Sequence, residues 1–298
     1  MRFSNKVPVA ILEVLFLVLF WAWVLSAVLF LRNTFLPRMP LAVLPTSWPL
    51  PFEPVRFQAT DGLWLSGWKI MAQAQAPWII LCHGLGANRS DLLDIAAALS
   101  RAGYNLLVFD FRAHGESQGR VTSFGWREQR DLEGALAFLG RQPEIPERPY
   151  GVFGISMGGA VAVMVAARDE RLGAVAVDSI YPNLEESIAH HIKLLYRLPR
   201  IPFLLFVSST YRIRFGVWPR QMSPLDAVSH ISPRALLVIH GGSDPRMPKD
   251  DATRLFEAAQ EPKQLWIIEE ADHLGGLQAD PETYLQKLVG FFDSCLKQ

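Results

Sequence analysis

The sequence predicts an α/β protein: a mostly parallel sheet with helices on both faces, a helical insertion, and a transmembrane helix at the N-terminus. From about residue 55 onward, short apolar segments typical of buried parallel strands alternate with segments of helical character. Residues 7–31, in contrast, are almost entirely apolar. The chain has 298 residues, half of them hydrophobic, which is enough for one sizeable domain and an appendage.

Residues 7–31 fit an uncleaved membrane anchor, which we assign to residues 1–36. The stretch contains one charge, Glu13, and is long enough to span a hydrocarbon core of about 30 Å. A cleaved signal peptide is the alternative, but its apolar region is about 7–15 residues long and ends at a site of small residues. Here the stretch is longer, and Phe30-Leu31-Arg32 at its end does not resemble such a site.

Basic residues flank the anchor on both sides, with Arg2 and Lys6 before it and Arg32 and Arg38 after it. The terminal amine adds a small excess on the N-terminal side, and positively charged flanks tend to stay in the cytoplasm. By a narrow margin, this rule favours a cytoplasmic N-terminus with the following domain outside.

The overall charge excludes some classes of function. Lys and Arg together number 29, as do Asp and Glu, so the net charge is zero and no basic patch points to a nucleic-acid partner. The two cysteines, Cys82 and Cys295, lie far apart and give neither a disulfide framework nor zinc-ligand spacing. We therefore expect no nucleic acid, no metal and no cofactor.

A proline-rich segment, residues 37–54, follows the anchor and predicts an extended, fairly stiff linker. The α/β domain is expected over residues 55–298. It begins with a hairpin, because two segments of strand character flank the turn dipeptide Asp61-Gly62. The expected elements are strands 55–60, 63–71, 78–83, 105–110, 150–153, 174–178, 235–240 and 264–268, and helices 91–101 (capped by Ser90), 126–139, 159–168, 250–259 and 281–296.

The segment Gly154-Ile155-Ser156-Met157-Gly158 is typical of a nucleophile elbow, a sharp strand-to-helix turn with a serine at its apex. The apex of such a turn has a strained backbone, and glycines beside it let the strand and the helix approach each other. A plain glycine-rich junction is the alternative. The interpretation of Ser156 as a nucleophile therefore depends on finding its partners.

A nucleophilic serine needs a base and an acid, which in a parallel sheet should lie just after the carboxyl ends of strands. His273 follows the last predicted strand, and the glycines after it leave the ring room to reach Ser156. Asp244 follows the preceding strand and would orient the ring and stabilise the imidazolium. An Asx turn before Pro245 is the other role open to Asp244, and Asp178 is the second candidate acid.

The reaction would also need two backbone N–H groups to stabilise a developing oxyanion. The N–H of Met157, directly after the serine, is one candidate, and that of Leu85 in the loop after an earlier strand is the other. Gly84 beside Leu85 allows close approach of backbone to substrate. We expect His83 to hydrogen-bond within this loop as a structural residue.

Residues 182–232 interrupt the alternation with about 50 apolar, helical residues, whereas such connections usually take about 2–6. We predict a lid over the carboxyl edge of the sheet that lines an acyl pocket. Two alternatives remain open. One is an extra helical layer that only packs, and the other is a second contact with lipid, because 194–197 and 211–215 mix apolar and basic residues.

Several segments together form a recognisable pattern: His83-Gly84-Leu85-Gly86, residues 109–117, residues 154–159, Asp244 and His273. This pattern resembles the α/β-hydrolase superfamily, in the branch of serine-aminopeptidase-like lipases and membrane-anchored acyl-protein thioesterase-like enzymes. The resemblance covers roughly residues 55–298, and the chain order of serine, aspartate and histidine is that of the superfamily. It implies that Asp110 and the loop after it brace the site. Ala113 departs from the usual glycine of the second motif.

These features favour a membrane-anchored serine hydrolase that cleaves esters or thioesters of small molecules or lipids with an apolar acyl chain. A peptidase of the aminopeptidase type is the second hypothesis, in which Glu185 and Glu186 would hold the substrate amine. The third is a non-catalytic, membrane-tethered scaffold, because a fold alone does not establish a function.

Overall fold

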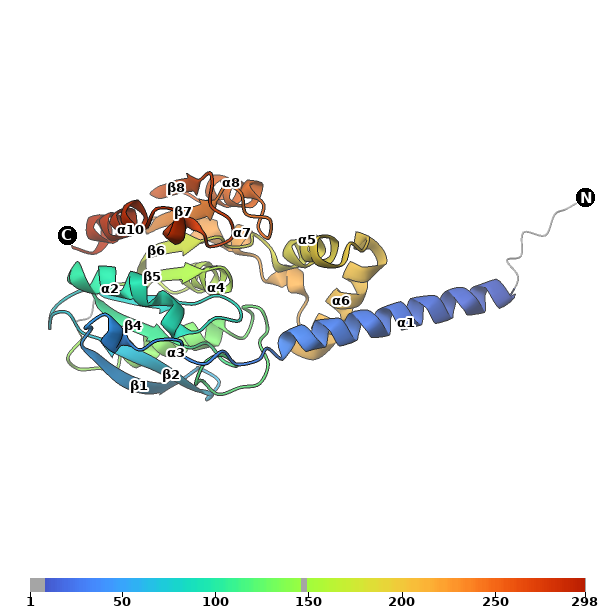
Figure 1. Ribbon diagram of the computed structural model, residues 1–298, viewed down its shortest axis with the longest axis horizontal. Helices are drawn as coiled ribbons and strands as arrows, with labels where there is room; N and C mark the ends of the chain where they lie inside the picture. The colour runs from blue at the N-terminus through green and yellow to red at the C-terminus, as the bar shows by residue number, and fades with distance from the viewer. Residues whose placement is uncertain (1–8, 146–148, 298) are drawn as a thin grey trace, which may run out of the picture.

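The computed structural model describes residues 9–145 and 149–297, which form an α/β domain with a long helix extending from it (Figure 1). The sheet has eight strands in the order β1-β2-β4-β3-β5-β6-β7-β8. β2 is antiparallel to both of its neighbours, and all other pairs are parallel. The strands are β1 (Phe52–Gln58), β2 (Trp64–Ile70), β3 (Trp78–Cys82), β4 (Asn105–Phe109), β5 (Tyr150–Ile155), β6 (Leu172–Asp178), β7 (Ala235–Gly241) and β8 (Lys263–Ile268). The predicted α/β fold with a mostly parallel sheet is therefore confirmed.

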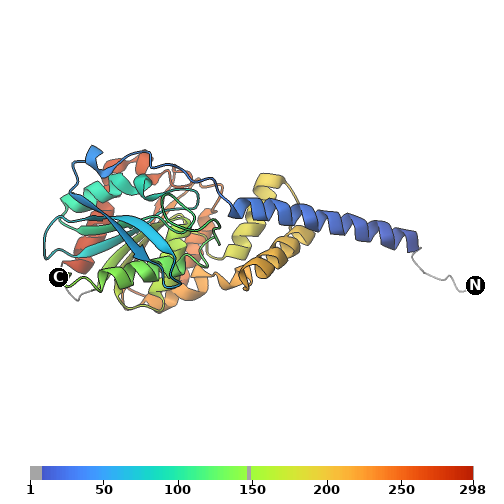
Figure 2. The same ribbon diagram turned by 90° about the horizontal axis from the view of Figure 1, so that it is seen from below.

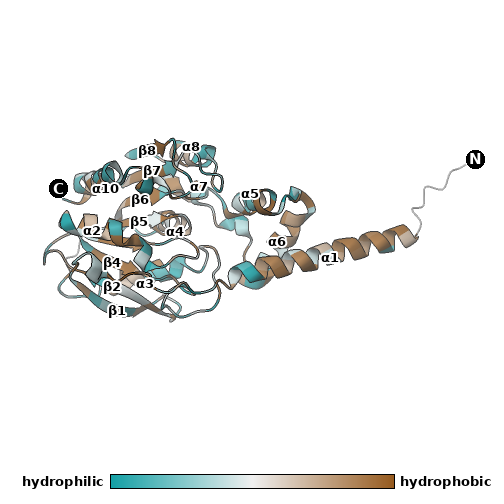
Figure 3. Ribbon diagram, in the orientation of Figure 1, coloured by the Kyte–Doolittle hydropathy of each residue, from teal (hydrophilic) through white to brown (hydrophobic). Residues whose placement is uncertain are grey.

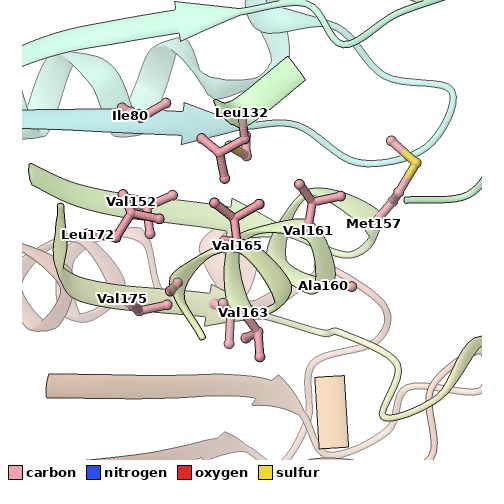
Figure 4. Close-up of a cluster of buried hydrophobic side chains, with 14 of the residues drawn as sticks. Ile80, Leu132, Val152, Met157, Ala160, Val161, Val163, Val165, Leu172 and Val175 are labelled. Carbon is pink, nitrogen blue, oxygen red and sulfur yellow. The ribbon is translucent and has the colours of Figure 1, made fainter. Parts of the chain in front are cut away.

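Helices bury both faces of the sheet. α2 (Leu93–Arg101) and α10 (Pro281–Leu296) pack on one face, and α3 (Gln129–Leu139), α4 (Met157–Ala166) and α8 (Lys249–Ala258) pack on the other. α4 lies in the centre, where Val161, Val163 and Val165 contribute to a continuous apolar cluster (Figure 4). Burial on both faces explains why the central strands read as unbroken apolar runs, since all five residues of β3 are buried.

The expected hairpin is present, but it begins earlier than expected. β1 and β2 pair from Phe52 with Ile70 to Gln58 with Trp64, and Gly62 supplies the positive φ of 84° in the turn. β1 therefore starts three residues before the expected boundary at residue 55. Pro54 is tolerated within it because β1 is the edge strand of the sheet.

The start of the helix after β3 also differs from the prediction. Asn88, not Ser90, is the capping residue: its side chain accepts a hydrogen bond of 2.9 Å from the N–H of Ser90. The carboxylate of Asp91 accepts in return from the N–H of Asn88 at 2.9 Å, which completes a capping box. One turn of 3₁₀-helix, Arg89–Leu92, then precedes α2.

The proline-rich segment lies along the domain instead of standing free as a spacer. The Trp48 indole donates to Asp94 at 3.0 Å, and Leu50 is buried. The guanidinium of Arg38 donates to the carbonyls of Gly115 and Gly119. These contacts hold the segment against the loops that surround the carboxyl edge of the sheet.

The N-terminal helix α1 (Val9–Thr34) is long and apolar enough to cross a membrane. Most of its apolar side chains are exposed, and it projects from the domain as an almost uniformly hydrophobic rod (Figure 3). Its last turns are different, because Ser26, Phe30 and Thr34 are buried against the rest of the protein.

The insertion between β6 and β7 has two parts. α5 (Leu184–Tyr196) and α6 (Arg200–Phe215) form a hairpin that leaves the domain on the same side as α1 and lies beside its C-terminal part (Figures 1 and 2). The second part, with α7 (Pro224–Ala227) flanked by two 3₁₀ turns, returns to pack on α4. The hairpin lies on the side of the domain from which α1 projects (Figure 1), and its role as a lid stays a prediction.

Candidate active site

Ser156 lies at the apex of a tight turn between β5 and α4. Its backbone has φ 49° and ψ −119°, a conformation that a residue with a side chain rarely adopts. Such strain persists only where the surrounding structure imposes it, and it occurs preferentially at functional sites. The turn leaves the serine 9% exposed, at the N-terminus of a helix and the carboxyl edge of the sheet.

The glycines of this turn are required by close packing. A Cβ on Gly158 would lie 2.4 Å from the carbonyl oxygens of Cys82 and His83, and one on Gly154 would lie 2.6 Å from the backbone of Gly159. Both distances are too short for a carbon atom. The Gly-x-Ser-x-Gly spacing is therefore what allows β5, α4 and the end of β3 to meet at this point.

His273 and Asp244 are joined by a short hydrogen bond. Nδ1 of the ring lies 2.7 Å from Oδ2 of the carboxylate, whose side chain is fully buried. The other oxygen, Oδ1, accepts from the N–H groups of Arg246 at 2.8 Å and Met247 at 3.0 Å. The predicted Asx turn thus exists together with the pairing to His273, and it fixes the carboxylate that faces the ring.

The charge state of Asp244 follows from these contacts. Burial by itself would raise its pKa, but the hydrogen bonds from His273 and from the two N–H groups outweigh burial and lower the pKa below its usual value. Asp244 is therefore ionised at neutral pH and can stabilise positive charge on the ring.

Ser156 and His273 line the same cavity, of about 360 Å³, within the size range of ligand sites. A hydrogen bond between the serine hydroxyl and the ring is not among those formed by the described residues. In proteins without substrate such bonds are often long and tighten only in the complex. The structure thus brings the two side chains to one cavity and pairs only the histidine and the aspartate directly.

Asp178, the second candidate acid, has other partners. Its carboxylate is buried and accepts from the hydroxyls of Tyr284 and Ser179, at 2.7 and 2.8 Å. Burial raises its pKa, and the two hydroxyls offset only part of this increase. Asp178 is a structural acid at the end of β6, and Asp244 is the acid that contacts the histidine.

Leu85 and Met157, the two residues predicted to supply N–H groups to an oxyanion, line the same cavity. Met157 is the first residue of α4, where N–H groups have no partner within the helix. Leu85 and Gly84 line the cavity with Ser156, and the Cα of Gly84 is so close that an added Cβ would lie 3.5 Å from the serine Cβ. Among the described residues, neither the Leu85 nor the Met157 N–H donates a hydrogen bond to protein.

The loop that carries Leu85 is held by two buried histidines. His83 accepts the N–H of Phe111 at its Nε2 and contacts the carbonyl of Gly84 with its Nδ1, 2.7 Å away. His114 accepts the N–H of Gly86 at 3.1 Å. Burial lowers the pKa of both rings, so that each stays neutral and keeps a nitrogen free to accept. The role expected for His83 matches this geometry.

Asp110 forms a second brace behind the loop. It accepts hydrogen bonds from the backbone N–H groups of Arg89 and Glu116, and its carboxylate forms a buried ion pair with the Arg89 guanidinium. These contacts connect the end of β4 to the helix after β3. Asp110 therefore supports the site without reaching the cavity.

The walls of the cavity come from the N-terminal helix and the insertion, two segments whose contact was not predicted from the sequence. One wall is formed by α1, and the facing wall is formed by the α5–α6 hairpin. The lining residues from these elements are Ser26, Leu29, Phe30 and Asn33 of α1, and Leu184, Ser187, Ile188, His191, Ile192, Leu195, Tyr196, Phe203 and Val207 of the hairpin. The signal in the sequence was a pair of polar residues, Ser26 and Asn33, seven positions apart and therefore on one face of a mainly apolar helix.

Glu185 and Glu186 are not among the residues that line this cavity. Glu186 pairs with Arg254 at 2.7 Å, and the carboxylate of Glu185 contacts the hydroxyl of Ser208 at 3.4 Å. Glu186 instead borders a second hollow of about 730 Å³ at the outer side of α5, which contains none of the predicted catalytic residues. The two glutamates therefore provide no amine site beside Ser156.

This fold, with a serine elbow and a histidine–aspartate pair at the carboxyl edge of its sheet, defines the class of the α/β hydrolases. The chain belongs to the alpha/beta hydrolase family, whose sequence model matches residues 79–286.

Known proteins agree with this assignment. YfhR of Escherichia coli K12 is 28% identical over 301 residues, covering 98% of this chain and 97% of YfhR. Polyketide transferase grgF of a Penicillium species is 26% identical over 286 residues, covering 83% of this chain and 97% of grgF. The esterase Pf2001 of Pyrococcus furiosus superposes with a TM-score of 0.75 at 25% identity, covering 88% of this chain and 98% of the esterase. The family and the likeness to the esterase support a hydrolase.

Proposed function

We propose that the protein is a membrane-anchored serine hydrolase that cleaves carboxylic esters or thioesters through an acyl-enzyme on Ser156. The observation that carries the proposal is the shared cavity: a strained serine at the N-terminus of α4 and a histidine held at 2.7 Å by a buried aspartate line one apolar pocket. Nucleophile, base and orienting acid are the parts that acyl transfer requires.

In the proposed reaction, Nε2 of His273 takes the proton of the Ser156 hydroxyl while Oγ attacks the acyl carbon. Asp244 stabilises the imidazolium that forms, and the N–H groups of Leu85 and Met157 stabilise the oxyanion. Collapse of the tetrahedral intermediate breaks the bond to the leaving alcohol or thiol, which receives the proton from His273. Water, deprotonated by the same ring, then attacks the acyl-enzyme and releases the carboxylic acid and the free serine.

The lining of the cavity favours an apolar acyl group. Leucine, isoleucine, phenylalanine and valine side chains are the most frequent in it, and the polar side chains include Ser156 and His273. The esterase likeness agrees with this choice. Since Glu185 and Glu186 lie outside the cavity, the structure favours an ester or thioester over a peptide with a free amine.

We further propose that α1 is retained in the mature protein as its membrane anchor. The ring of Phe30 is 6% exposed and contacts Phe124, Tyr211 and Phe215, with ring centroids 5.8, 5.9 and 6.5 Å away. Removing α1 as a signal peptide would expose these rings and open one side of the cavity. N-terminal sequencing of the membrane-extracted protein tests retention, and a mature N-terminus beyond residue 30 would contradict it.

A fluorophosphonate probe tests the nucleophile. We expect the wild-type protein to be labelled and Ser156→Ala to lose both labelling and ester hydrolysis. Ser243→Ala is the matched control, because Ser243 lies exposed in the loop of Asp244 and, among the described residues, its hydroxyl bonds only to the carbonyl of Glu269. Labelling that persists in Ser156→Ala would overturn the assignment.

Substrate class is tested on the same variants. Turnover of p-nitrophenyl and thioester substrates is compared with that of an aminoacyl anilide, and we expect the ester and thioester to be preferred. Faster turnover of the anilide would support a peptidase. Inertness toward the probe and all substrates would support a scaffold on a hydrolase fold.

A further inference from the structure

The helix that is long enough to cross a membrane also forms one wall of the cavity that holds Ser156. Ser26, Leu29, Phe30 and Asn33 line the cavity. Their spacing of three and four residues places them on a single face of α1. α1 is therefore both an apolar rod exposed along most of its length and, in its last turns, a part of the candidate active site.

The facing wall is the inner side of α5, whose cavity residues also follow helical spacing. The cavity extends from Ser156 outward between the two helices as far as Ser26 of α1 and Leu195 of α5. Leu195 is 64% exposed, so the outer end of the cavity opens beside α1. A hydrogen bond of 3.4 Å from Asn33 to the Tyr196 hydroxyl is a polar contact across this gap.

The position of the gap relative to a bilayer follows from the length of α1. The helix has 26 residues and is about 39 Å long, which exceeds the hydrocarbon thickness of about 30 Å. Its last turns, which lie beside the hairpin, would therefore reach the border of the acyl layer. The outer end of the cavity would open at that border.

The outer surface of the hairpin fits the same border. Ile201, Leu205 and Ile213 of α6, a helix in contact with α1, are 71%, 60% and 76% exposed. Lys193, Arg197 and Arg200 line the hollow at the tip of the hairpin. Exposed apolar side chains beside basic ones complement acyl chains and the anionic phosphates above them.

We propose that the last turns of α1 are a specificity-determining wall of the substrate site, and that the substrate is a bilayer lipid ester or thioester with a long acyl chain. The chain enters laterally between α1 and the α5–α6 hairpin and lies along the face of Ser26, Leu29, Phe30 and Asn33. The inference rests on the proposed function, because it places the acyl carbon at Ser156. It makes the anchor a part of the binding site in addition to a tether.

Substitutions along the cavity face test the wall. In full-length protein reconstituted into phosphatidylcholine vesicles, kcat/KM is measured for p-nitrophenyl acetate, octanoate and palmitate. Each buried methylene is worth about fourfold, so a tryptophan that displaces two or three methylenes lowers the palmitate-to-acetate ratio on the order of tenfold or more. Leu29→Trp shortens the accepted chain more than Ser26→Trp, because residue 29 lies about 4.5 Å nearer to the serine along the helix.

Leu25→Trp is the matched control. It makes the same change on the same helix, but Leu25 is 56% exposed and does not line the cavity, so we expect the wild-type ratio. A smaller fraction of folded protein lowers the rates with palmitate and acetate equally, so it does not change the palmitate-to-acetate ratio of a variant. Unchanged ratios in both Leu29→Trp and Ser26→Trp would overturn the inference, while hydrolysis that still depends on Ser156 would leave the proposed function standing.

Lateral access has its own test. A palmitoyl ester is placed either in the vesicles that carry the enzyme or in separate vesicles that do not fuse with them. We expect hydrolysis of the ester in the shared vesicles to be faster by tenfold or more. Equal rates in the two arrangements would overturn entry from the bilayer, and absence of hydrolysis of every ester by the wild type would instead overturn the proposed function.

Discussion

Replacing Asp244 with asparagine removes the charge that orients His273 and preserves the shape of the loop that carries it. An asparagine carbonyl can keep the hydrogen bonds that Oδ1 accepts from Arg246 and Met247. Its amide group then faces Nδ1 of the ring at the present distance of 2.7 Å. Because an amide N–H donates, Nδ1 must accept, and the ring proton moves to Nε2.

A ring protonated at Nε2 cannot take the proton of Ser156, and no carboxylate remains to stabilise the imidazolium. We expect kcat for ester hydrolysis to fall by about 10⁴-fold, equivalent to about 5 kcal/mol of transition-state stabilisation. The lost charge-assisted hydrogen bond should also lower the free energy of unfolding by about 2 kcal/mol. Steady-state hydrolysis of a p-nitrophenyl ester and a thermal melt on the same preparation separate the two effects.

Asp178→Asn is the matched control, because Asp178 is equally buried but bonds to Tyr284 and Ser179. We expect it to cost about 1 kcal/mol of stability and to leave kcat within a few-fold of wild type. If Asp178→Asn reduces kcat more than Asp244→Asn does, the assignment of the orienting acid is refuted.

Three further predictions concern the elbow, pH and the anchor. Gly158→Ala should lower the free energy of unfolding by about 1–3 kcal/mol or more, because its Cβ would lie 2.4 Å from two carbonyl oxygens. Gly290→Ala, on the exposed side of α10 where an added Cβ would meet no described atom within 4 Å, should be neutral or stabilising. Equal melting temperatures for the two variants would contradict the packing argument. Two arginines lower the pKa of Asp61 to about 2, against the effect of partial burial. A carboxylate whose pKa is lowered on folding stabilises the fold at pH values above its pKa in the unfolded chain. The destabilisation by Asp61→Asn should therefore be full at pH 5 and disappear as the pH falls from about 4 to about 2. A difference in melting temperature that does not depend on pH would exclude this linkage. Phe30→Ala should lower the free energy of unfolding of the detergent-solubilised protein by about 3 kcal/mol. Phe16→Ala, at a site 67% exposed, should change it little. Similar losses of stability in the two variants would show that α1 does not pack on the domain.

Local patterns were sufficient for the strands, most helices and the elbow. Alternation of apolar strands with helical segments predicts a parallel sheet, because strands that are buried on both faces consist of nearly uninterrupted apolar residues. The elbow was predictable for a related reason: only glycine fits at positions 154 and 158, where a Cβ would meet backbone atoms. His273 and Asp244 could be placed after the last two strands because the carboxyl ends of parallel strands share one edge.

What local patterns could not supply was the choice between residues of the same type. Ser90 and Asn88 are both good caps, and the structure selects Asn88 because Asp91 completes the reciprocal bond. Asp178 and Asp244 both follow strands, and only contact with a distant tyrosine or histidine distinguishes them.

The sequence by itself determined the fold class, the elbow and the chain order of serine, aspartate and histidine, because these depend on strand composition and on the steric demands of one turn. Only the tertiary structure decided that α1 and the insertion line one cavity, with Phe30 against Tyr211 and Phe215. α1 and α6 are separated by more than 160 residues. The local spacing of apolar residues shows that each helix has an apolar face, but it does not show which two faces pack together. Burial of two apolar surfaces against each other is non-directional, so their pairing emerges only when the whole chain is folded.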